Sequence, residues 1–494
     1  MELSQKKHFE YLSSVFKGYM GSLYCAANPV FNKHSLHGIF DIDENINECL
    51  EKKDLLFFVI VILKYYLSAF RWIVIFSITL VIWRIIKLRS RIEVYDISWL
   101  IDSYILDSSF YTGKYRDIYF GDFTEWLEQR GKKYCYLPRI ISSGLSVKKT
   151  LALMKNLGAN CVKFVSEYDT FSLIDYVKLI HFVVIYPFAI KITCNSIIKK
   201  GGNRELYLAH QAVKSIQKSS VCYIYSRYLF SLKLSSFIHK KVSLLSWHEN
   251  YALEKLFYRG LRNKNTNIKI YACRSSIFPR EFIHQYIDQA ETAYGLNPDV
   301  LLVNGEYYRS DAGNEIVGPS FRYKYLFNIP VISSARDKIV VLLPYYEDQA
   351  RIFLDVIRKY KLKNILIKFH PATNLKKFKY QYENIGDVVL SPISELLKVS
   401  KIIIGVSTGA LLEAVCYGVP ALVFELPGIK TYNYFPILGK SLVWDSILPN
   451  ENLELKINYM VELSKRDFFK MISRVLLNCC FKNPTFKLYD ELFN

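Results

Sequence analysis

Short apolar runs alternate with amphipathic stretches along the chain after residue 91, which is typical of strands that alternate with helices. Residues 120–140 show this clearly, because a helix pattern ends at Gly131 and an apolar run follows it. A second helix pattern covers residues 250–264. The remaining apolar runs predict strands at residues 93–104, 161–166, 220–226, 241–247, 268–274 and 299–305. This order predicts a parallel α/β domain over residues 92–330.

A second α/β unit begins near residue 335. The run at 338–344 is almost continuously apolar, as in a strand that is buried on both faces of a parallel sheet. Four more apolar runs follow at 364–369, 387–392, 401–406 and 420–426, with helix patterns that begin near Glu347, Ser394 and Gly409. We therefore expect a second Rossmann-like domain over residues 335–494, and an interdomain connection around residues 313–336. Ligands of such sheets bind outside the carboxyl ends of the strands.

The most apolar segment lies before both domains, at residues 55–91. Lys64, Arg71 and Arg84 divide it into stretches that are shorter than the roughly 20 residues needed to cross a bilayer. We interpret it as a helical segment that associates with a membrane without spanning it. A buried helical pair and a true spanning helix remain open as alternatives. A second apolar stretch, at residues 177–192, is interpreted as core or interface.

Length and composition add further limits. At 494 residues the chain is too long for one hydrophobic core, so we expect two domains and extra elements in an N-terminal region, residues 1–91. Lys and Arg outnumber Asp and Glu by 65 to 45, which indicates an anionic partner such as a phosphate-bearing substrate or anionic lipid. The basic residues follow no DNA- or RNA-binding motif, so we expect no nucleic-acid partner. The ten cysteines lack metal-ligand spacing and the chain opens with no secretory signal, so we expect no metal and a cytosolic compartment.

A small hydroxylated turn, Ser407, Thr408 and Gly409, separates the apolar run at 401–406 from the helix pattern that follows. Backbone N–H groups at such a helix start can bind an anion, and glycine lets a phosphate approach the backbone. Glu413 lies one helical turn further on, where its carboxylate can accept hydrogen bonds from ribose hydroxyls. The sequence therefore predicts a nucleotide site at this turn. The alternative interpretation is an ordinary helix cap at Ser407.

A second polar group ends a neighbouring strand. His370 and Pro371 follow the apolar run at 364–369, so we expect the imidazole at the same carboxyl edge as the turn, where it can donate to a phosphate. Lys368 is two residues earlier and points to the same face of its strand, where its charge could add to the site. The alternatives are a structural histidine at a strand end and a solvated lysine.

The motifs "KFHP" at 368–371 and "GVSTGALLEAVCYGVPALVFE" at 405–425 resemble those of bacterial surface-polysaccharide glycosyltransferases of the GT-B fold. They are similar to the HP and Ser/Thr motifs of bacterial sialyltransferases, polysialyltransferases and capsule Kdo transferases, and to elements of CDP-glycerol glycerophosphotransferases. The resemblance implies that His370, Ser407 and Thr408 contact the nucleotide and phosphate of a donor. Residues 246–279, followed by 297–305, look like the layout of surface-carbohydrate biosynthesis proteins.

The catalytic base has no motif of its own, because the acidic-acidic-Gly motif of the sialyltransferases is missing from the first domain. We assign the base to Glu249, which follows the apolar run at 241–247 and so is expected at the carboxyl edge of the first sheet. His248 and Asp122 are the reserve candidates. The alternative for Glu249 is a cap of the helix that begins near Tyr251.

These observations predict an α/β protein of two Rossmann-like domains, with an N-terminal apolar helical segment, that acts as an inverting, metal-independent glycosyltransferase. It would move a sugar from a nucleotide-activated donor, with a CMP-sugar favoured, to a glycan or glycolipid acceptor of a capsule, O-antigen or lipopolysaccharide. It would work at the cytoplasmic face of the plasma membrane and need no cofactor. Two alternatives remain, namely an enzyme like the nonhydrolysing UDP-sugar 2-epimerases and a noncatalytic scaffold of a polysaccharide assembly.

Overall fold

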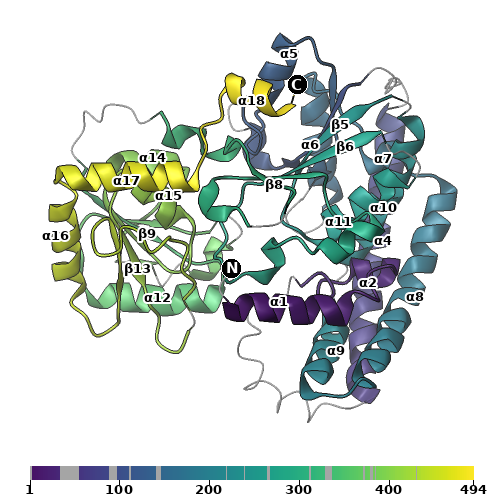
Figure 1. Ribbon diagram of the computed structural model, residues 1–494, viewed down its shortest axis with the longest axis horizontal. Coiled ribbons are helices and arrows are strands. Elements are labelled where there is room, and N and C mark those ends of the chain that lie inside the picture. The colour runs from purple at the N-terminus through teal and green to yellow at the C-terminus, as the bar shows by residue number, and fades with distance from the viewer. Residues whose placement is uncertain are drawn as a thin grey trace.

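Two six-stranded parallel sheets, each covered by helices, form two lobes (Figure 1). The computed structural model describes residues 3–33, 55–87, 97–110, 113–140, 146–217, 220–238, 240–263, 267–310, 313–328, 336–370, 373–378, 382–383, 385–429 and 431–493.

The first sheet has the strand order β3-β1-β5-β6-β7-β8, and all its pairs are parallel. Its strands are β1 (Trp99–Asp102), β3 (Tyr134–Tyr136), β5 (Val242–Trp247), β6 (Ile268–Arg274), β7 (Val300–Val303) and β8 (Glu315–Val317). A short parallel pair, β2 (Tyr104–Ile105) and β4 (Arg139–Ile140), continues from the ends of β1 and β3. The helices that follow these strands include α5 (Phe123–Gln129), α6 (Val147–Ala159), α7 (Glu167–Thr170) and α11 (Ala252–Arg262).

The second sheet has the order β11-β10-β9-β12-β13-β14, again all parallel. Its strands are β9 (Lys338–Leu342), β10 (Ile365–Lys368), β11 (Asp387–Val388), β12 (Ser400–Gly405), β13 (Ala421–Phe424) and β14 (Trp444–Ile447). Its helices are α12 (Glu347–Lys359), α14 (Ile393–Val399), α15 (Ala410–Cys416), α16 (Leu453–Leu463) and α17 (Asp467–Cys480). The order in which strands are added reverses between the neighbouring strands β9 and β12 at the middle of the sheet, and doubly wound sheets bind ligands at such a point.

The predicted fold class is confirmed, because both parallel α/β sheets and the apolar N-terminal helix are present. Two predicted strands are wrong. Residues 220–226 begin the helix α10 (Ser220–Phe237), whose sides are buried nearly all round, so its apolar run lacks the helical period. Residues 161–166 make a single bridge, from Phe164 to Tyr136, and no strand.

The segment at 313–336 is also more than a connection. Its residues 315–317 form β8, where the buried carboxylate of Glu315 pairs with Arg274 at 3.4 Å. A charged residue inside a strand conceals the apolar pattern, which explains why the strand was missed. The 3-10 helix η7 (Phe321–Leu326) follows and packs on the first domain. Residues 329–335 lie outside the described part of the chain, and the boundary between 330 and 335 stays a prediction.

Helices from the N-terminal region and from the first domain pack side by side at one end of the first lobe (Figure 1). They are α1 (Leu3–Phe16), α2 (Leu23–Ala27), α4 (Leu55–Lys87), α8 (Leu173–Ile198), α9 (Asn203–Ser215) and α10. The segment predicted as interrupted apolar stretches is one continuous helix of 33 residues, α4. By length and composition alone, two described helical segments could cross a membrane, namely Leu56–Ile86 and Leu173–Ile198.

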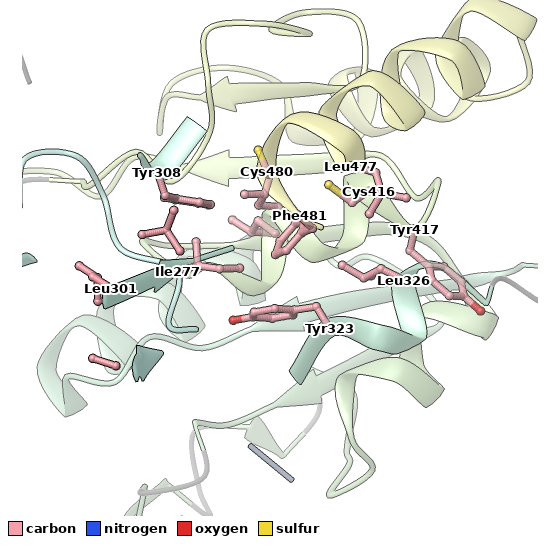
Figure 2. Close-up of a cluster of buried hydrophobic side chains, with 14 of the residues drawn as sticks. Ile277, Leu301, Tyr308, Tyr323, Leu326, Cys416, Tyr417, Leu477, Cys480 and Phe481 are labelled. Carbon is pink, nitrogen blue, oxygen red and sulfur yellow. The ribbon is translucent and has the colours of Figure 1, made fainter. Parts of the chain in front are cut away.

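An apolar cluster joins the two lobes (Figure 2). Ile277, Tyr323 and Leu326 of the first lobe pack in the same core as residues of α15 and α17. Gly305 allows the closest approach, because a Cβ atom there would lie 2.4 Å from the backbone of Cys480. The last helix, α18 (Phe486–Phe493), then returns to the first lobe, where Asp490 accepts a hydrogen bond from Trp126 at 3.0 Å. These contacts hold the carboxyl edges of the two sheets in a fixed relation.

Candidate functional site

The turn Ser407–Gly409 lies where the sequence predicts it, between β12 and α15. Ser407 has a positive φ of 42°, and its Oγ accepts a hydrogen bond from the backbone N–H of Tyr432 at 2.9 Å. Thr408 Oγ1 accepts from the N–H of Ala410 at 3.4 Å. Ser407 is therefore not a cap of α15, since its hydroxyl holds the 432 loop against the turn.

Gly409 serves a purpose that the sequence does not reveal. A Cβ atom on this residue would lie 2.9 Å from Cβ of Ile277, which belongs to the other lobe. The expected reason for the glycine was a phosphate close to the backbone, but the space beside its Cα is filled by the isoleucine side chain. Glycine is needed here because the two lobes touch at this point.

Glu413 lies one turn into α15 and is half-buried. Its carboxylate accepts a hydrogen bond from the hydroxyl of Tyr325, a residue of η7 in the first lobe. Burial raises the pKa of Glu413, while the positive charge of Arg322 and the Tyr325 hydrogen bond oppose that rise. The expected position of this carboxylate, within one turn of the Ser407–Gly409 turn, is confirmed, but it faces partners from the first lobe.

His370 follows β10 and is exposed, and its ring meets that of Tyr345 edge to face, with 5.0 Å between the two ring centroids. Reduced hydration lowers the pKa of the imidazole, and the positive charges of Arg322 and Lys368 lower it further. Lys368 has the expected orientation on the partly exposed face of β10, yet its Nζ donates to the carbonyl of Ser391 at 2.6 Å. Pro371 lies outside the described residues.

Arg322 is the site residue that sequence reasoning missed. It lies in η7, is exposed, and comes from the stretch that was interpreted as a connection. Its positive charge lowers the pKa of His370, of Glu413 and of Tyr119. One guanidinium therefore influences residues of both lobes. The only sequence signal for it is an arginine between aromatic residues in "SFRYKY", which has no diagnostic spacing.

Glu249 follows β5, at the carboxyl edge of the first sheet as predicted, and is half-buried. Its Oε1 accepts from Trp247 Nε1 at 3.2 Å and from Ser276 Oγ at 3.0 Å. The alternative role of Glu249 as a cap of α11 is wrong, because it is Glu254 that accepts a hydrogen bond from the backbone N–H of Tyr251, at 2.8 Å. The negative charge of Glu249 raises the pKa of Tyr119, whereas the positive charge of Arg322 lowers it.

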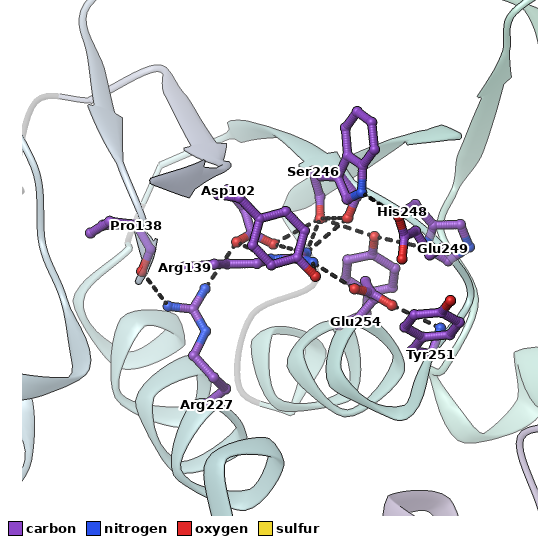
Figure 3. Close-up of polar contacts among 12 residues, drawn as sticks. Asp102, Pro138, Arg139, Arg227, Ser246, His248, Glu249, Tyr251 and Glu254 are labelled. Atoms are coloured by element: carbon purple, nitrogen blue, oxygen red, sulfur yellow. Dashed lines mark hydrogen bonds and ion pairs between the residues drawn. The ribbon is translucent and has the colours of Figure 1, made fainter. Parts of the chain in front are cut away.

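A fully buried network of charges supports this edge of the first sheet (Figure 3). Arg139 donates to Asp102 at 2.7 Å and to Glu254 at 2.5 Å, and Arg227 donates to Asp102 at 2.9 Å. Burial raises the pKa of Glu254 to about 7, against the opposing charge of Arg139. The ion pairs tie β1, β4, α10 and α11 together, so they fix the start of α11 and the Glu249 loop before it.

The two reserve candidates for the catalytic base, His248 and Asp122, lie in less suitable positions than Glu249. His248 is fully buried, with its Nδ1 3.2 Å from the hydroxyl of Tyr258, and burial lowers its pKa well below the usual value. An acceptor cannot reach an imidazole in that position. Asp122 pairs with Lys324 and accepts from the hydroxyl of Tyr489 at 2.8 Å, so it holds α18 on the first lobe.

Three side chains and one turn thus make up the candidate site at the junction between the lobes. Among the described residues, no group of three or more His, Cys, Asp or Glu side chains could hold a metal ion. The first lobe supplies a carboxylate, Glu249, and a guanidinium, Arg322. The second supplies an imidazole, His370, and the turn at residues 407–409. This arrangement can bind an anion on one side and accept a proton on the other.

The similarity of this chain to known proteins is limited to overall shape. No protein-family model and no curated protein matches the chain. Among solved structures it is similar to MurG from Acinetobacter baumannii, with 12% identity, coverage of 80% of this chain and 99% of that one, and a TM-score of 0.40. A UDP-N-acetylglucosamine 2-epimerase has 9% identity, coverage of 77% and 91%, and a TM-score of 0.42. The wall teichoic acid polymerase TagF has 11% identity, coverage of 86% and 96%, and a TM-score of 0.38. A likeness this distant carries no conclusion about activity.

Proposed function

We propose that the protein is a glycosyltransferase that moves a sugar from a nucleotide-activated donor to a glycan or glycolipid acceptor. The observation that carries the proposal is the position of η7 at the carboxyl edge of the second sheet, where its Tyr325 donates a hydrogen bond to Glu413 and its Arg322 lowers the pKa of His370. A doubly wound sheet binds its ligand at that edge. A cation and an imidazole there suit the phosphate of a nucleotide, and a carboxylate one turn away suits its ribose.

The leaving group is the donor phosphate. As the bond between the anomeric carbon and the phosphate oxygen breaks, negative charge develops on that oxygen, and a preorganised cation stabilises it. Arg322 would hold this charge from the first lobe, with His370 and the hydroxyl of Thr408 on the other side. Lys368 adds positive charge near His370 while its Nζ stays on Ser391. Because α15 has only seven residues, we expect its dipole to stabilise the negative charge on the phosphate less than the guanidinium does.

Glu249 is the proposed base. It would take the proton of the acceptor hydroxyl, whose oxygen then attacks the anomeric carbon from the face opposite the departing phosphate, so that the configuration inverts. The hydrogen bonds from Trp247 and Ser276 keep one carboxylate oxygen in place. The proton goes to Glu249 and the electron pair leaves with the nucleotide, so the step needs neither metal nor cofactor.

For the donor we favour a CMP-sugar, on the strength of the His-Pro and Ser/Thr motifs, and for the acceptor a growing capsule, O-antigen or lipopolysaccharide. We place the reaction at the cytoplasmic face of the plasma membrane. The charge balance of the chain, 65 basic against 45 acidic residues, is consistent with a phosphate-bearing substrate and an anionic membrane surface.

A thermal-shift screen with CMP, CDP, UDP and GDP tests the proposal, because a ligand that binds the native state raises its apparent stability. A shift with CMP supports the CMP-sugar donor, and a shift with CDP supports a polyol phosphate donor. A response to UDP alone would favour the epimerase alternative. If no nucleotide shifts the transition, the scaffold alternative holds and the proposed transferase activity is wrong.

A further inference from the structure

The helices α4 and α8 lie side by side and antiparallel at one end of the first lobe (Figure 1). Tyr65 of α4 donates to the carbonyl of Val183 at 3.1 Å, and Tyr66 donates to that of Val184 at 2.8 Å. Further along the pair, Ser77 is hydrogen-bonded to the hydroxyl of Tyr176. These contacts join residues 65–77 of α4 to residues 176–184 of α8.

One side of α4 is buried and the other is exposed. The buried side chains follow each other at intervals of three and four residues: Val61, Tyr65, Ala69, Trp72, Phe76, Thr79 and Trp83. The opposite side is apolar as well, with the exposed residues Leu56, Val59, Ile60, Leu63, Leu67, Phe70, Val74, Ile78, Val81 and Ile85. Leu67 and Phe70, at mid-helix, are 72% and 69% exposed. An amphipathic surface helix would carry polar residues on that side.

The neighbouring helix continues the same surface. The exposed apolar residues of α8 are Leu173, Ile174, Val177, Ile180, Val184, Ile185, Phe188, Ile192 and Ile198. Residues 177–192 were interpreted as core or interface, and one side of α8 is indeed core, but the other is uncovered. Apolar patches larger than several hundred Å² are rare on soluble monomers and mark interaction sites. The exposed residues of α4 and α8 together are called the two-helix face below.

The charges on the two-helix face have one sign. Lys64 and Arg71 of α4 and Lys178 of α8 are exposed among the apolar residues. The described residues of α4 include no Asp or Glu. In α8 the one carboxylate is Asp175, which is buried and pairs with Lys233 at 2.5 Å. An apolar surface with basic residues and no exposed carboxylate complements an anionic bilayer, where lysine and arginine meet the headgroups.

The packing of α4 shows how it would meet the bilayer. Near one end Phe57 stacks on His210 of α9 at 5.1 Å, and near the other Trp83 donates to Asp169 of α7 at 2.8 Å. Its buried side is therefore covered by the first lobe along its whole length. If α4 crossed the membrane, the charged residues of α9, among them the exposed Arg204 and Lys214, would enter the hydrocarbon with it.

We propose that α4 and α8 lie together in the plane of an anionic lipid bilayer, with the two-helix face inserted in one leaflet and neither helix crossing it. This goes beyond the proposed function, because it assigns a membrane-binding surface to residues of the first domain and needs no catalytic site. It would place the lobe that carries Glu249 at the membrane, where a glycolipid acceptor lies.

Flotation of the full-length protein with vesicles tests the surface. The vesicles are phosphatidylcholine with and without about 30% phosphatidylglycerol, and anionic lipid should raise binding about tenfold or more. The paired substitution Leu67→Glu with Phe70→Glu in α4, and Val184→Glu with Phe188→Glu in α8, should each lower binding at least about tenfold. The matched control, Leu390→Glu with Ile437→Glu, changes residues of the second lobe that are 81% and 89% exposed, and should bind as the parent does.

Unchanged vesicle binding in both α4 and α8 variants would overturn the proposal. So would a parent that ignores vesicles but forms an oligomer which the same variants dissociate, since a second copy would then cover the face. Nucleotide-induced thermal shifts, measured in parallel, report the donor site separately from membrane binding.

Labelling of vesicle-bound protein tests the in-plane orientation. Lys178→Cys and Asn195→Cys place thiols at exposed positions near opposite ends of α8. With an impermeant maleimide added outside sealed vesicles, both thiols should react above the background of the parent. A thiol at one end that reacts only after the vesicles are lysed would show that α8 spans the bilayer, which contradicts the proposal.

Discussion

Replacing Glu254 with Gln should change how stability depends on pH. The carboxyl group is fully buried and bound to Arg139 and to the backbone N–H of Tyr251. Burial raises its pKa from the usual 4.5 to about 7, and nearby carboxylates, Glu249 first, add to the rise. Between about pH 4.5 and about pH 7, the folded state therefore holds a proton at Glu254 that the unfolded chain releases.

The sign and size follow from proton linkage. A raised carboxyl pKa stabilises the fold fully below the unfolded pKa, and the contribution is lost as pH rises through the folded pKa. One unit of pKa corresponds to about 1.4 kcal/mol, so a shift from 4.5 to about 7 is worth about 3.4 kcal/mol of unfolding free energy in total, of which about 2.5 kcal/mol is lost between about pH 5 and about pH 8. Gln cannot ionise, so Glu254→Gln should lack this loss.

The assay is urea unfolding of the parent and of Glu254→Gln across that pH range. Other groups titrate in both proteins, so the difference between the two unfolding free energies isolates position 254. The unfolding free energy of the parent minus that of Glu254→Gln should fall by roughly 2.5 kcal/mol as the pH rises across this range, because only the parent loses stability at position 254. Glu395→Gln is the control, because Glu395 forms an exposed pair with Lys398. A difference that stays constant with pH would show that the pKa of Glu254 is not raised in the folded state and would refute this reasoning.

Three further substitutions test the junction between the lobes. Gly409→Val should lower the unfolding free energy by about 1 to 3 kcal/mol, measured by urea unfolding, because the new side chain meets Ile277; an unchanged value would contradict this contact. Arg322→Gln should raise the pKa of His370, because it removes a positive charge that disfavours the imidazolium. NMR titration of the imidazole measures this pKa, and an unaltered value would show that the two residues lie far apart. Glu413→Gln should raise the donor KM more than it lowers kcat in steady-state transfer kinetics, and equal effects on both would argue against a ribose contact.

Both sheets could be predicted from the sequence where a strand is buried on both faces. β6 and β9 are nearly continuous apolar runs, and their predicted positions are confirmed. The same rule failed at α10, because a helix that is buried all round gives an equally continuous run. β8 was missed for the opposite reason, since its buried Glu315 depends on Arg274 from another strand.

The candidate site was predictable only at strand ends. His370, Glu249 and the Ser407–Gly409 turn each follow a strand, so the rule for parallel sheets places them at a carboxyl edge. Arg322 could not be found this way, because it lies in a 3-10 helix and its relation to His370 exists only once the lobes have packed. Contacts between distant segments, such as Gly409 with Ile277, leave no periodic signal in the chain.

In the proposed nucleotide site at the junction of the lobes, Arg322 and His370 bind the phosphate. Both contacts can be measured by calorimetric titration of the nucleotide that gives the largest thermal shift into the parent, Arg322→Gln and His370→Ala. Each variant should lose a charge-assisted hydrogen bond of about 1.5 to 3 kcal/mol, which raises Kd by roughly tenfold to more than a hundredfold. Arg309→Gln, an exposed arginine that pairs with Glu306, should leave Kd unchanged. Equal Kd values in the parent and both site variants would show that neither residue binds the phosphate.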